Sequence, residues 1–294
     1  MPESVHTIHL ASAFDQNYIM PFYVLLASLF HHNEDSRLII HSIATGVSDS
    51  EKAGIEAFVS RNNASIFFYT VDEAYVRANV VLPENNHFTI ATYYRLFLPA
   101  ILPASVGKLL YIDTDAIVIG DLKKLYDTAL GNAPFAAVPD SYPHTRTDLG
   151  LDKKEQYFNA GVLLIDVANW KQQHVTEQAI QFMNDYPDKI KYVDQDALNA
   201  TQRGKWYTLA KKYNITWFDV PLETRKKDIL KEAVIVHYTT SNKPWNTLGG
   251  NKLRYLYHGY LKKLPHARHK RYIDFVEQPY HKTVPLPPHP GVVF

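Results

Sequence analysis

Short apolar runs of strand length alternate along this chain with longer segments of helical periodicity, and this alternation limits the fold more than any other feature of the sequence. Continuous apolar strands that alternate with helices are typical of a mostly parallel sheet covered by helices on both faces. We therefore predict an α/β protein with a single Rossmann-like, mostly parallel sheet flanked by helices. The expected strands are 8–11, 37–43, 64–69, 108–112, 133–139, 160–166 and 233–236. The expected helices are 18–31, 48–61, 89–98 and 175–184.

Two helix ends carry clear local signals. Ser48 and Glu51 have the spacing of a capping box, in which each side chain accepts a hydrogen bond from the backbone of the other. Pro99 is expected to end the helix that starts at Thr89, because proline has no N–H to donate and its ring clashes with the preceding turn.

Composition excludes several classes of protein. The 294 residues include no Cys, which rules out a disulfide scaffold, a thiolate metal site and a cysteine nucleophile. With 31 Lys and Arg against 30 Asp and Glu, the formal charge of +1 gives no reason to expect a nucleic acid partner. The chain starts without a cationic region before an apolar stretch, and no apolar run reaches the ~20 residues that a bilayer requires. We expect a cytoplasmic protein.

The distribution of charge sets the end of the chain apart. Residues 251–282 carry eight Lys and Arg against Asp274 and Glu277, a net charge of +6, so the remainder of the chain sums to −5. We predict a catalytic domain over 1–250 and a basic, aromatic C-terminal extension over 251–294. The extension suits a peripheral contact with anionic lipid at the inner face of the membrane. The alternative is an ordinary solvated helix that packs on the domain. The aromatic residues of the extension include Tyr255, Tyr257, Tyr260, Tyr272 and Phe275.

Two carboxylates directly follow one apolar strand. Asp113 and Asp115 come after 108–112, and extended chain places residues i and i+2 on one face, so both carboxylates can reach one hard cation. The Asp-x-Asp pattern alone is weak, since about one is expected by chance and a second occurs at Asp194 and Asp196. The position of Asp113 and Asp115 directly after a strand is stronger evidence for a ligand site, because ligands bind beyond the carboxyl ends of strands in such sheets. The alternative is a solvated turn in which Asp acts as a cap.

His237 ends another apolar strand in the same way. Two carboxylates and an imidazole would form a mixed nitrogen and oxygen site, which favours Mn²⁺ over Mg²⁺. The alternative is a structural His with satisfied hydrogen bonds. The residues from Tyr238 to Trp245 combine small hydroxyl side chains with Lys243, which suits a loop that holds a diphosphate. The sequence lacks a Gly-rich Walker or Rossmann fingerprint, so neither an ATPase loop nor NAD binding is indicated.

Two further segments lie where a ligand would approach the sheet. Ala160 and Gly161 follow Asn159, and such small residues would let a ligand come close to the backbone, or would simply form a tight strand entrance. Asp15 and Tyr18 follow the first strand and suit hydrogen bonding and stacking on a base, although Asp15 equally suits a helix N-cap.

Taken in order, these motifs resemble the family 8 retaining glycosyltransferases, a group that includes bacterial lipopolysaccharide galactosyl- and glucosyltransferases and glycogenin. The resemblance spans residues 8–250 and rests on six motifs with family-like spacing. One departure is Thr240, at a position where relatives commonly have Gly. The motifs are Asp15-Gln-Asn-Tyr18, Thr92-Tyr-Tyr-Arg95-Leu, Leu110-Tyr-Ile-Asp113-Thr-Asp115, Phe158-Asn-Ala-Gly161-Val, Asp194-Gln-Asp196-x-Leu-Asn199 and His237 followed by Lys243-Pro-Trp245.

The resemblance implies a GT-A fold and transfer of a hexose from UDP-glucose or UDP-galactose to a glycan or lipid-linked acceptor, with Mn²⁺ or Mg²⁺ as cofactor and an α-linked product. Leu82 to Phe88 resembles the mobile loop that folds over the donor. The implied metal ligands are Asp113, Asp115 and His237. The implied donor-binding residues are Ala13, Asp15, Asn17, Tyr18, Phe88, Arg95, Asp113, Thr114, Asp115, Ala160, Gly161, Thr240 and Lys243. The implied catalytic residues are Gln195, Asp194, Asn159 and Asp140.

Retention of configuration requires either attack from the face of the leaving group or a double displacement. Gln195 would stand behind the anomeric carbon, but a neutral amide is a poor nucleophile. We therefore expect front-face substitution, in which the departing phosphate helps to deprotonate the acceptor hydroxyl.

Two other functions share part of this pattern. A haloacid-dehalogenase-type phosphatase also places Asp-x-Asp after an apolar strand, but that motif usually lies near the N-terminus and needs a later Lys and an acidic pair. A non-catalytic sugar-nucleotide-binding module would be expected to lose a metal ligand, and Asp113, Asp115 and His237 are all present.

Overall fold

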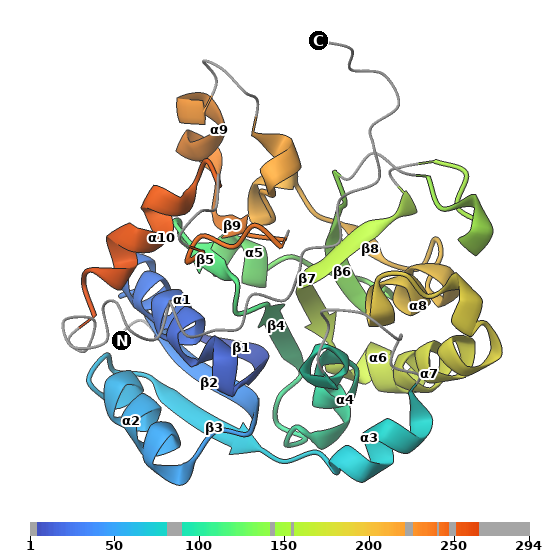
Figure 1. The fold of residues 1–294 in the computed structure, drawn as a ribbon, viewed down its shortest axis with the longest axis horizontal. Helices are drawn as coiled ribbons and strands as arrows, with labels where there is room; N and C mark the ends of the chain where they lie inside the picture. The colour runs from blue at the N-terminus through green and yellow to red at the C-terminus, as the bar shows by residue number, and fades with distance from the viewer. Residues whose placement is uncertain are drawn as a thin grey trace.

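The strands of the protein form one large sheet and one small one. The computed structural model describes residues 5–80, 90–141, 145–153, 156–220, 226–239, 241–246 and 251–264. The strands in these residues are β1 (His6–Asp15), β2 (Ser36–Thr45), β3 (Ser65–Tyr69), β4 (Lys108–Ile112), β5 (Ala116–Val118), β6 (Phe135–Pro139), β7 (Phe158–Asp166), β8 (Tyr207–Thr208) and β9 (Ile235–His237). Among the described residues, seven strands form a central sheet in the order β3-β2-β1-β4-β7-β6-β8, and β5 pairs with β9 (Figure 1).

The central sheet is mostly parallel, as expected, with β7 as the exception. Strands β1 to β4 run parallel to one another, whereas β7 is antiparallel to both β4 and β6. Ile112 at the end of β4 pairs with Val162, and the Asp113 N–H donates to the Gly161 carbonyl at 2.8 Å. The reversed direction of β7 therefore brings its first residues to the sheet edge where the parallel strands end. In a fully parallel sheet those residues would lie at the opposite edge.

Helices cover both faces of this sheet. Leu110 and Ile112 pack with α1, α2 and α5, while Leu109 and Tyr111 pack on the other face with α4, α6, α7 and α8. This alternation follows from the two-residue period of a strand, and each fully buried large apolar side chain contributes roughly 1.5–3 kcal/mol. The helices are α1 (Ile19–His32), α2 (Asp49–Ser60), α3 (Glu73–Asn79), α4 (Tyr94–Ile101), α5 (Lys123–Tyr126), α6 (Val167–Gln172), α7 (Val175–Asp185), α8 (Val193–Thr201), α9 (Lys226–Glu232) and α10 (Arg254–Leu261). The 3-10 turns used below are η1 (Gln16–Tyr18), η2 (Ile90–Tyr93) and η6 (Lys211–Tyr213).

The two local helix signals have different outcomes. The capping box is confirmed, because Ser48 N–H donates to Glu51 Oε2 at 2.9 Å and Glu51 N–H donates to Ser48 Oγ at 3.3 Å. The expectation that Pro99 ends its helix is wrong, since α4 continues through Pro99 to Ile101. Pro99 removes only one backbone hydrogen bond, and almost every side chain of this short helix is buried, so tertiary packing outweighs the local preference.

The last expected strand does not join the central sheet. Strand β9 pairs antiparallel with β5, with His237 opposite Ala116. Both edges of β4 are already hydrogen-bonded, to β1 and to β7, so a further strand has to find another partner. Strand β5 directly follows Asp115, and Tyr238 N–H donates to the Asp115 carbonyl at 2.9 Å. This small sheet therefore carries His237 to the carboxylates that follow β4.

Helix α10, at the start of the basic extension, packs against the rest of the fold. Tyr257, Tyr260 and Leu264 are buried in a cluster with β5, β9 and α1. Figure 1 shows α10 in orange-red beside the blue helix α1. Tyr272 and Phe275, with the Lys and Arg residues from 268 to 282, lie outside the described residues.

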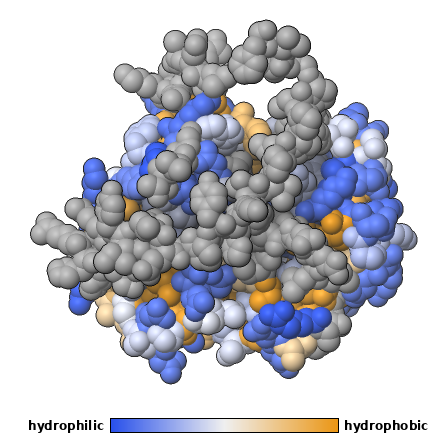
Figure 2. Space-filling model, viewed as in Figure 1, coloured by the Kyte–Doolittle hydropathy of each residue, from blue (hydrophilic) through white to orange (hydrophobic). Residues whose placement is uncertain are grey.

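The visible described surface mixes hydrophilic residues with smaller separate groups of hydrophobic ones (Figure 2). Scattered exposed apolar side chains are ordinary on a water-exposed surface. Within the part of the chain that the structure describes, every helix is too short or too polar to cross a bilayer.

Candidate active site

Three side chains from two sheets meet at the edge where β4 ends. Ligand atoms of Asp113, Asp115 and His237 all lie within 4.8 Å of one another. His237 Nε2 is 3.1 Å from Asp115 Oδ1 and 3.8 Å from Asp113 Oδ2. One imidazole nitrogen and two carboxylates are a donor set that suits a divalent transition ion. The structure thus brings together the three residues named from the sequence as metal ligands.

Gly161 makes this cluster possible. A Cβ atom at Gly161 would lie 2.0 Å from His237 Cε1 and 2.8 Å from Asp113 Oδ2, far inside van der Waals contact. The sequence suggested that small residues here would admit a ligand to the backbone. In the structure, the space that Gly161 leaves is filled by the His237 ring and the Asp113 carboxylate.

Asp113 is held from two further directions. The Tyr111 hydroxyl donates to Asp113 Oδ1 at 2.7 Å, and Arg95 Nη2 lies 3.2 Å from the same oxygen. The buried Arg95 side chain also donates to the Ala160 carbonyl at 2.5 Å and lies over the Tyr111 ring at 4.9 Å. These contacts orient the Asp113 carboxylate. They also join α4 to the start of β7 and to the end of β4.

Arg95 bridges Asp113 to Asp194. Arg95 Nε lies 2.9 Å from Asp194 Oδ2, and the Asp194 side chain is almost fully buried at the first turn of α8. Burial raises the pKa of Asp194 to about 7, although the positive charge of Arg95 opposes the shift. Burial disfavours the charged form of Arg95, but Asp113 and Asp194 outweigh it, so the pKa of Arg95 lies above its ordinary value.

Asp115 contacts Lys243 on one side and His237 on the other. Lys243 Nζ donates to Asp115 Oδ2 at 2.5 Å and to the Tyr238 carbonyl at 2.7 Å. Burial alone would raise the pKa of Asp115, but Lys243 and His237 together hold that pKa below its ordinary value. Lys243 therefore places a positive charge beside the cluster, where it could meet an anionic group.

Gln195, Asn159 and Asp140 converge at the start of β7. Gln195 Oε1 accepts from Ala160 N–H at 2.9 Å, and its amide donates to Tyr157 Oη at 3.0 Å and Asp140 Oδ2 at 3.4 Å. Asn159 Nδ2 also donates to Asp140 Oδ2, at 3.5 Å. These residues named from the sequence as catalytic therefore form one hydrogen-bonded group.

The segment after β1 lies close to the Lys243 loop. Asp15 caps η1 by accepting a hydrogen bond from Asn17 N–H at 2.9 Å, so the helix-cap alternative is realised. The ring of Tyr18 meets Trp245 edge-on, with 5.6 Å between centroids. Burial and then the charge of Asp115 raise the pKa of Tyr18. Contact of Asp15 or Tyr18 with a base stays a prediction.

The remaining residues that were predicted to bind the donor divide into two groups. Ala13 is buried in β1, and Thr114 is buried between the two carboxylates. Phe88 and Thr240 lie outside the described residues, as does the predicted loop from Leu82 to Phe88.

Sequence reasoning missed three polar residues that support the site. Tyr111 lies in β4, two residues before Asp113, so the two-residue alternation of extended chain contained a signal for it. Tyr157 donates to the buried Asp196 at 2.6 Å and accepts from Gln195. Asn214 follows η6 and contacts the ring of His237, and nothing local in the sequence marks it.

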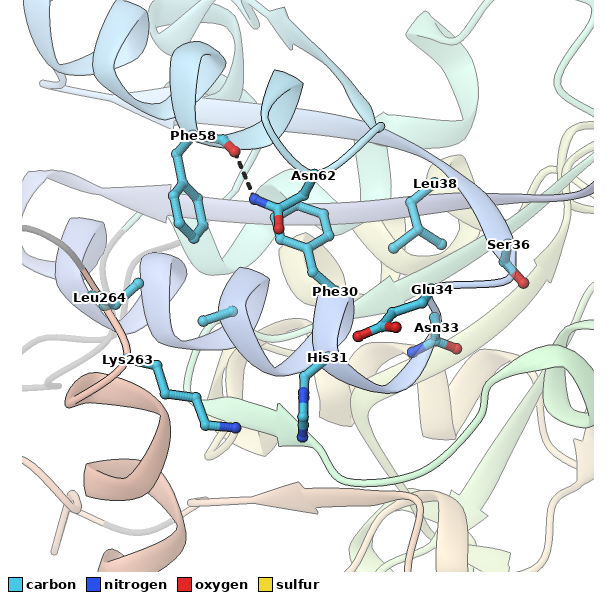
Figure 3. A pocket seen from close by; sticks show the side chains of 11 residues that line it. Phe30, His31, Asn33, Glu34, Ser36, Leu38, Phe58, Asn62, Lys263 and Leu264 are labelled. Carbon is cyan, nitrogen blue, oxygen red and sulfur yellow. Dashed lines mark hydrogen bonds between the residues drawn. The ribbon is translucent and has the colours of Figure 1, made fainter.

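A cavity of about 370 Å³ lies away from this site, between α1, α2 and the residues after α10 (Figure 3). His31, Glu34 and Lys263 are among its lining residues, and none of the candidate-site residues lines it. The candidate site is therefore defined by side-chain chemistry at the sheet edge rather than by this cavity.

Comparison with known proteins places the chain in a family. The sequence model described as Glycosyl transferase family 8 matches residues 9–249. The chain belongs to this family. It is 31% identical over 268 residues to General stress protein A of Bacillus subtilis, covering 86% of this chain and 93% of that protein. It is 28% identical over 249 residues to a lipopolysaccharide 1,2-glucosyltransferase of Escherichia coli, covering 81% of this chain and 73% of that enzyme.

A solved relative has the same architecture. The galactosyltransferase LgtC, crystallised with donor and acceptor sugar analogs, superposes with a TM-score of 0.75 at 25% identity. The match covers 88% of this chain and 96% of LgtC. The expected GT-A fold is confirmed, and family membership favours a glycosyltransferase over the phosphatase alternative.

Proposed function

We propose that this protein is a metal-dependent, retaining hexosyltransferase that moves glucose or galactose from a UDP-sugar to a glycan or lipid-linked acceptor and forms an α-linkage. The observation that carries the proposal is the meeting of Asp113, Asp115 and His237 beside the positive charge of Lys243. Two relatives, a lipopolysaccharide glucosyltransferase and a galactosyltransferase, support a hexose donor and a surface glycan acceptor.

The donor set supports Mn²⁺, with Mg²⁺ as the alternative. Asp113, Asp115 and His237 offer two hard oxygens and one imidazole nitrogen, and Gly161 leaves the room that these three groups need. A divalent cation held there would stabilise the negative charge that develops on the leaving diphosphate. Retention of all three ligands argues against a non-catalytic module.

The chain's own side chains supply the rest of the chemistry. Lys243 would neutralise charge on the diphosphate as a point cation. Arg95 orients Asp113 and the Ala160 carbonyl, and so shapes the position of the donor sugar. Asp15 and Tyr18 would contact the uracil.

The hydrogen bonds of Gln195 support front-face substitution. Its carbonyl oxygen already accepts from Ala160 N–H, and its amide nitrogen donates to Tyr157 and Asp140. A neutral amide held in this way is a poor nucleophile. The acceptor hydroxyl would therefore attack from the face of the leaving group and pass its proton to the departing phosphate.

Donor turnover tests the proposal. Purified protein is incubated with Mn²⁺ and UDP-glucose, UDP-galactose, GDP-glucose or ADP-glucose, and slow hydrolysis of each is followed. We expect turnover of a UDP-hexose that stops in EDTA and returns better with Mn²⁺ than with Ca²⁺. Asp115→Asn should lower the rate by roughly 100-fold or more, as expected when a ligand of a catalytic metal is lost.

Asp35→Asn serves as the matched control, because Asp35 is exposed in the turn between α1 and β2, at the opposite edge of the sheet. Its rate should equal that of the unmodified protein. Full activity in EDTA would refute metal dependence. When an acceptor sugar is added, a β-linked product by NMR would refute retention.

A further inference from the structure

A chain of hydrogen bonds with a fixed direction leads from the backbone of β7 to His237. It starts at Gly161 N–H, which donates to Asn159 Oδ1 at 3.0 Å. Asn214 Nδ2 donates to the same oxygen at 2.9 Å, and Asn214 Oδ1 lies 3.1 Å from His237 Nδ1. Asn159, Asn214 and His237 are all buried.

A backbone N–H sets the direction of the whole chain. It can only donate, so the Asn159 atom that faces Gly161 has to be the oxygen. The Asn159 nitrogen then faces the Asp140 carboxylate, which can only accept. The same reasoning applies one step on, because the Asn214 atom that faces Asn159 Oδ1 has to be the nitrogen. The Asn214 oxygen therefore faces His237, and it requires a proton on Nδ1.

The tautomer that follows is the one that a metal site needs. With the proton on Nδ1, a neutral His237 carries its lone pair on Nε2. Nε2 is also the ring atom that faces the carboxylates, 3.1 Å from Asp115 Oδ1. The ring edge that faces Asn214 points away from them.

We propose that Asn214 is a positioning residue, which holds the His237 ring and its Nδ1–H tautomer so that Nε2 is available to a divalent cation. This inference rests on the metal site of the proposed function and assigns a role to a residue outside the predicted ligand set. Partners of this kind behind a ligating His typically change metal affinity by 10- to 100-fold.

The backbone keeps Asn214 in place. Ile215 bridges to Val236 in parallel register, Ile215 N–H donates to the Ile235 carbonyl at 2.9 Å, and His237 N–H donates to the Ile215 carbonyl at 2.8 Å. The main chain on either side of Asn214 and His237 is therefore tied together, so a side-chain substitution removes the amide without freeing the loop.

Metal affinity of three variants tests the role. Mn²⁺ binding in the presence of UDP is measured by electron paramagnetic resonance, with thermal unfolding as a check on folding. Asn214→Leu is similar in size but cannot accept from Nδ1–H, and we expect its Mn²⁺ affinity to fall by about 10- to 100-fold. Asn214→Asp keeps an acceptor oxygen toward Nδ1 but sets its second oxygen against Asn159 Oδ1, so its affinity should fall, but less than that of Asn214→Leu. Asn33→Leu, which removes another buried amide far from the cluster, should bind Mn²⁺ unchanged.

A direct measurement needs no substitution. In the unmodified protein with Mg²⁺ and UDP, ¹⁵N NMR of labelled histidine should place the His237 proton on Nδ1. A proton on Nε2, or equal loss of affinity in folded Asn214→Asp and Asn214→Leu, would overturn the proposal. Mn²⁺ affinity that survives in Asn214→Leu would also overturn it and leave the proposed function standing. Failure of the unmodified protein to bind Mn²⁺ would instead refute the metal site itself.

Discussion

Gly161→Ala is expected to disable the proposed metal site through one added methyl group. The new Cβ would lie 2.0 Å from His237 Cε1, whereas ordinary contacts begin at 3.4 Å, so the ring or the strand has to move by about 1.4 Å. Gly161 lies within β7, and its carbonyl accepts from Asp113 N–H, so the backbone is tied on the side of β4. We therefore expect the His237 ring to be displaced from the carboxylates.

The magnitude follows from that displacement. A shift of ~1 Å in a catalytic group typically lowers the rate by about 100-fold, which corresponds to about 2.7 kcal/mol of transition-state stabilisation. Overpacking of a tight core position should lower the free energy of unfolding by about 1–3 kcal/mol. We expect Gly161→Ala to lose at least that factor of 100 in kcat/KM and to bind Mn²⁺ more weakly, while remaining folded.

The assay compares Gly161→Ala with Gly107→Ala for UDP-hexose turnover, Mn²⁺ affinity and urea unfolding. A Cβ at Gly107 would meet nothing within 4 Å. Gly107 lies just before β4, the strand that pairs with β7. The control should therefore behave as the unmodified protein. If Gly161→Ala binds Mn²⁺ as tightly as the control, the reasoning from close contact is refuted.

Four further predictions concern stability, domain boundaries, mechanism and the basic extension. Burial, followed by the neighbouring His9, lowers the pKa of His41 to about 4, below its ordinary value near 6.5, so the unfolded chain takes up a proton first as pH falls. The contribution of neutral His41 to stability is thus full above pH 6.5 and is lost toward pH 4. In urea unfolding, the free energy of unfolding should fall by about 2–3 kcal/mol by pH 4.5, and His41→Gln should not show this fall. In a calorimetric titration, a chain that ends at 250 should not bind UDP, whereas one that ends at 264 should bind it, because α10 supports the Lys243 loop. Equal binding by the two chains would contradict this support. Gln195→Ala should retain measurable transfer, well above the residual rate of Asp115→Asn, and loss as complete as that variant's would argue for double displacement. Neutralising the Lys and Arg residues of 252–282 should reduce co-sedimentation with anionic liposomes, and unchanged sedimentation would reject the membrane role.

The support that α10 gives to the Lys243 loop is visible in specific contacts. His258 Nε2 lies 3.1 Å from the Pro244 carbonyl, and the Trp245 ring packs on Tyr257 with 5.4 Å between centroids. Asn251 Nδ2 donates to the Asn242 carbonyl at 3.1 Å. These contacts join the loop to the start of the extension, which therefore takes part in positioning Lys243.

Local patterns in the sequence were sufficient to predict most elements of the fold. The apolar run 108–112 becomes β4 with the same bounds, and Ser48 and Glu51 form the capping box that their spacing predicts. The cluster of Asp113, Asp115 and His237 was also predictable, because the two carboxylates directly follow one apolar strand and His237 ends another. These features depend on residues close together in sequence, where periodicity and side-chain chemistry act directly.

Strand direction and strand partners were decided by the tertiary structure. A buried apolar strand has the same composition in either direction and offers hydrogen bonds at both edges, so nothing within 158–166 marks β7 as antiparallel. For the same reason the sequence did not reveal that β9 would pair with β5 rather than join the central sheet. Those two choices bring Gly161 against His237 and place Asn214 behind the ring. The sequence alone therefore determined which groups are available as ligands, while long-range packing, which no local pattern encodes, decided how they are oriented.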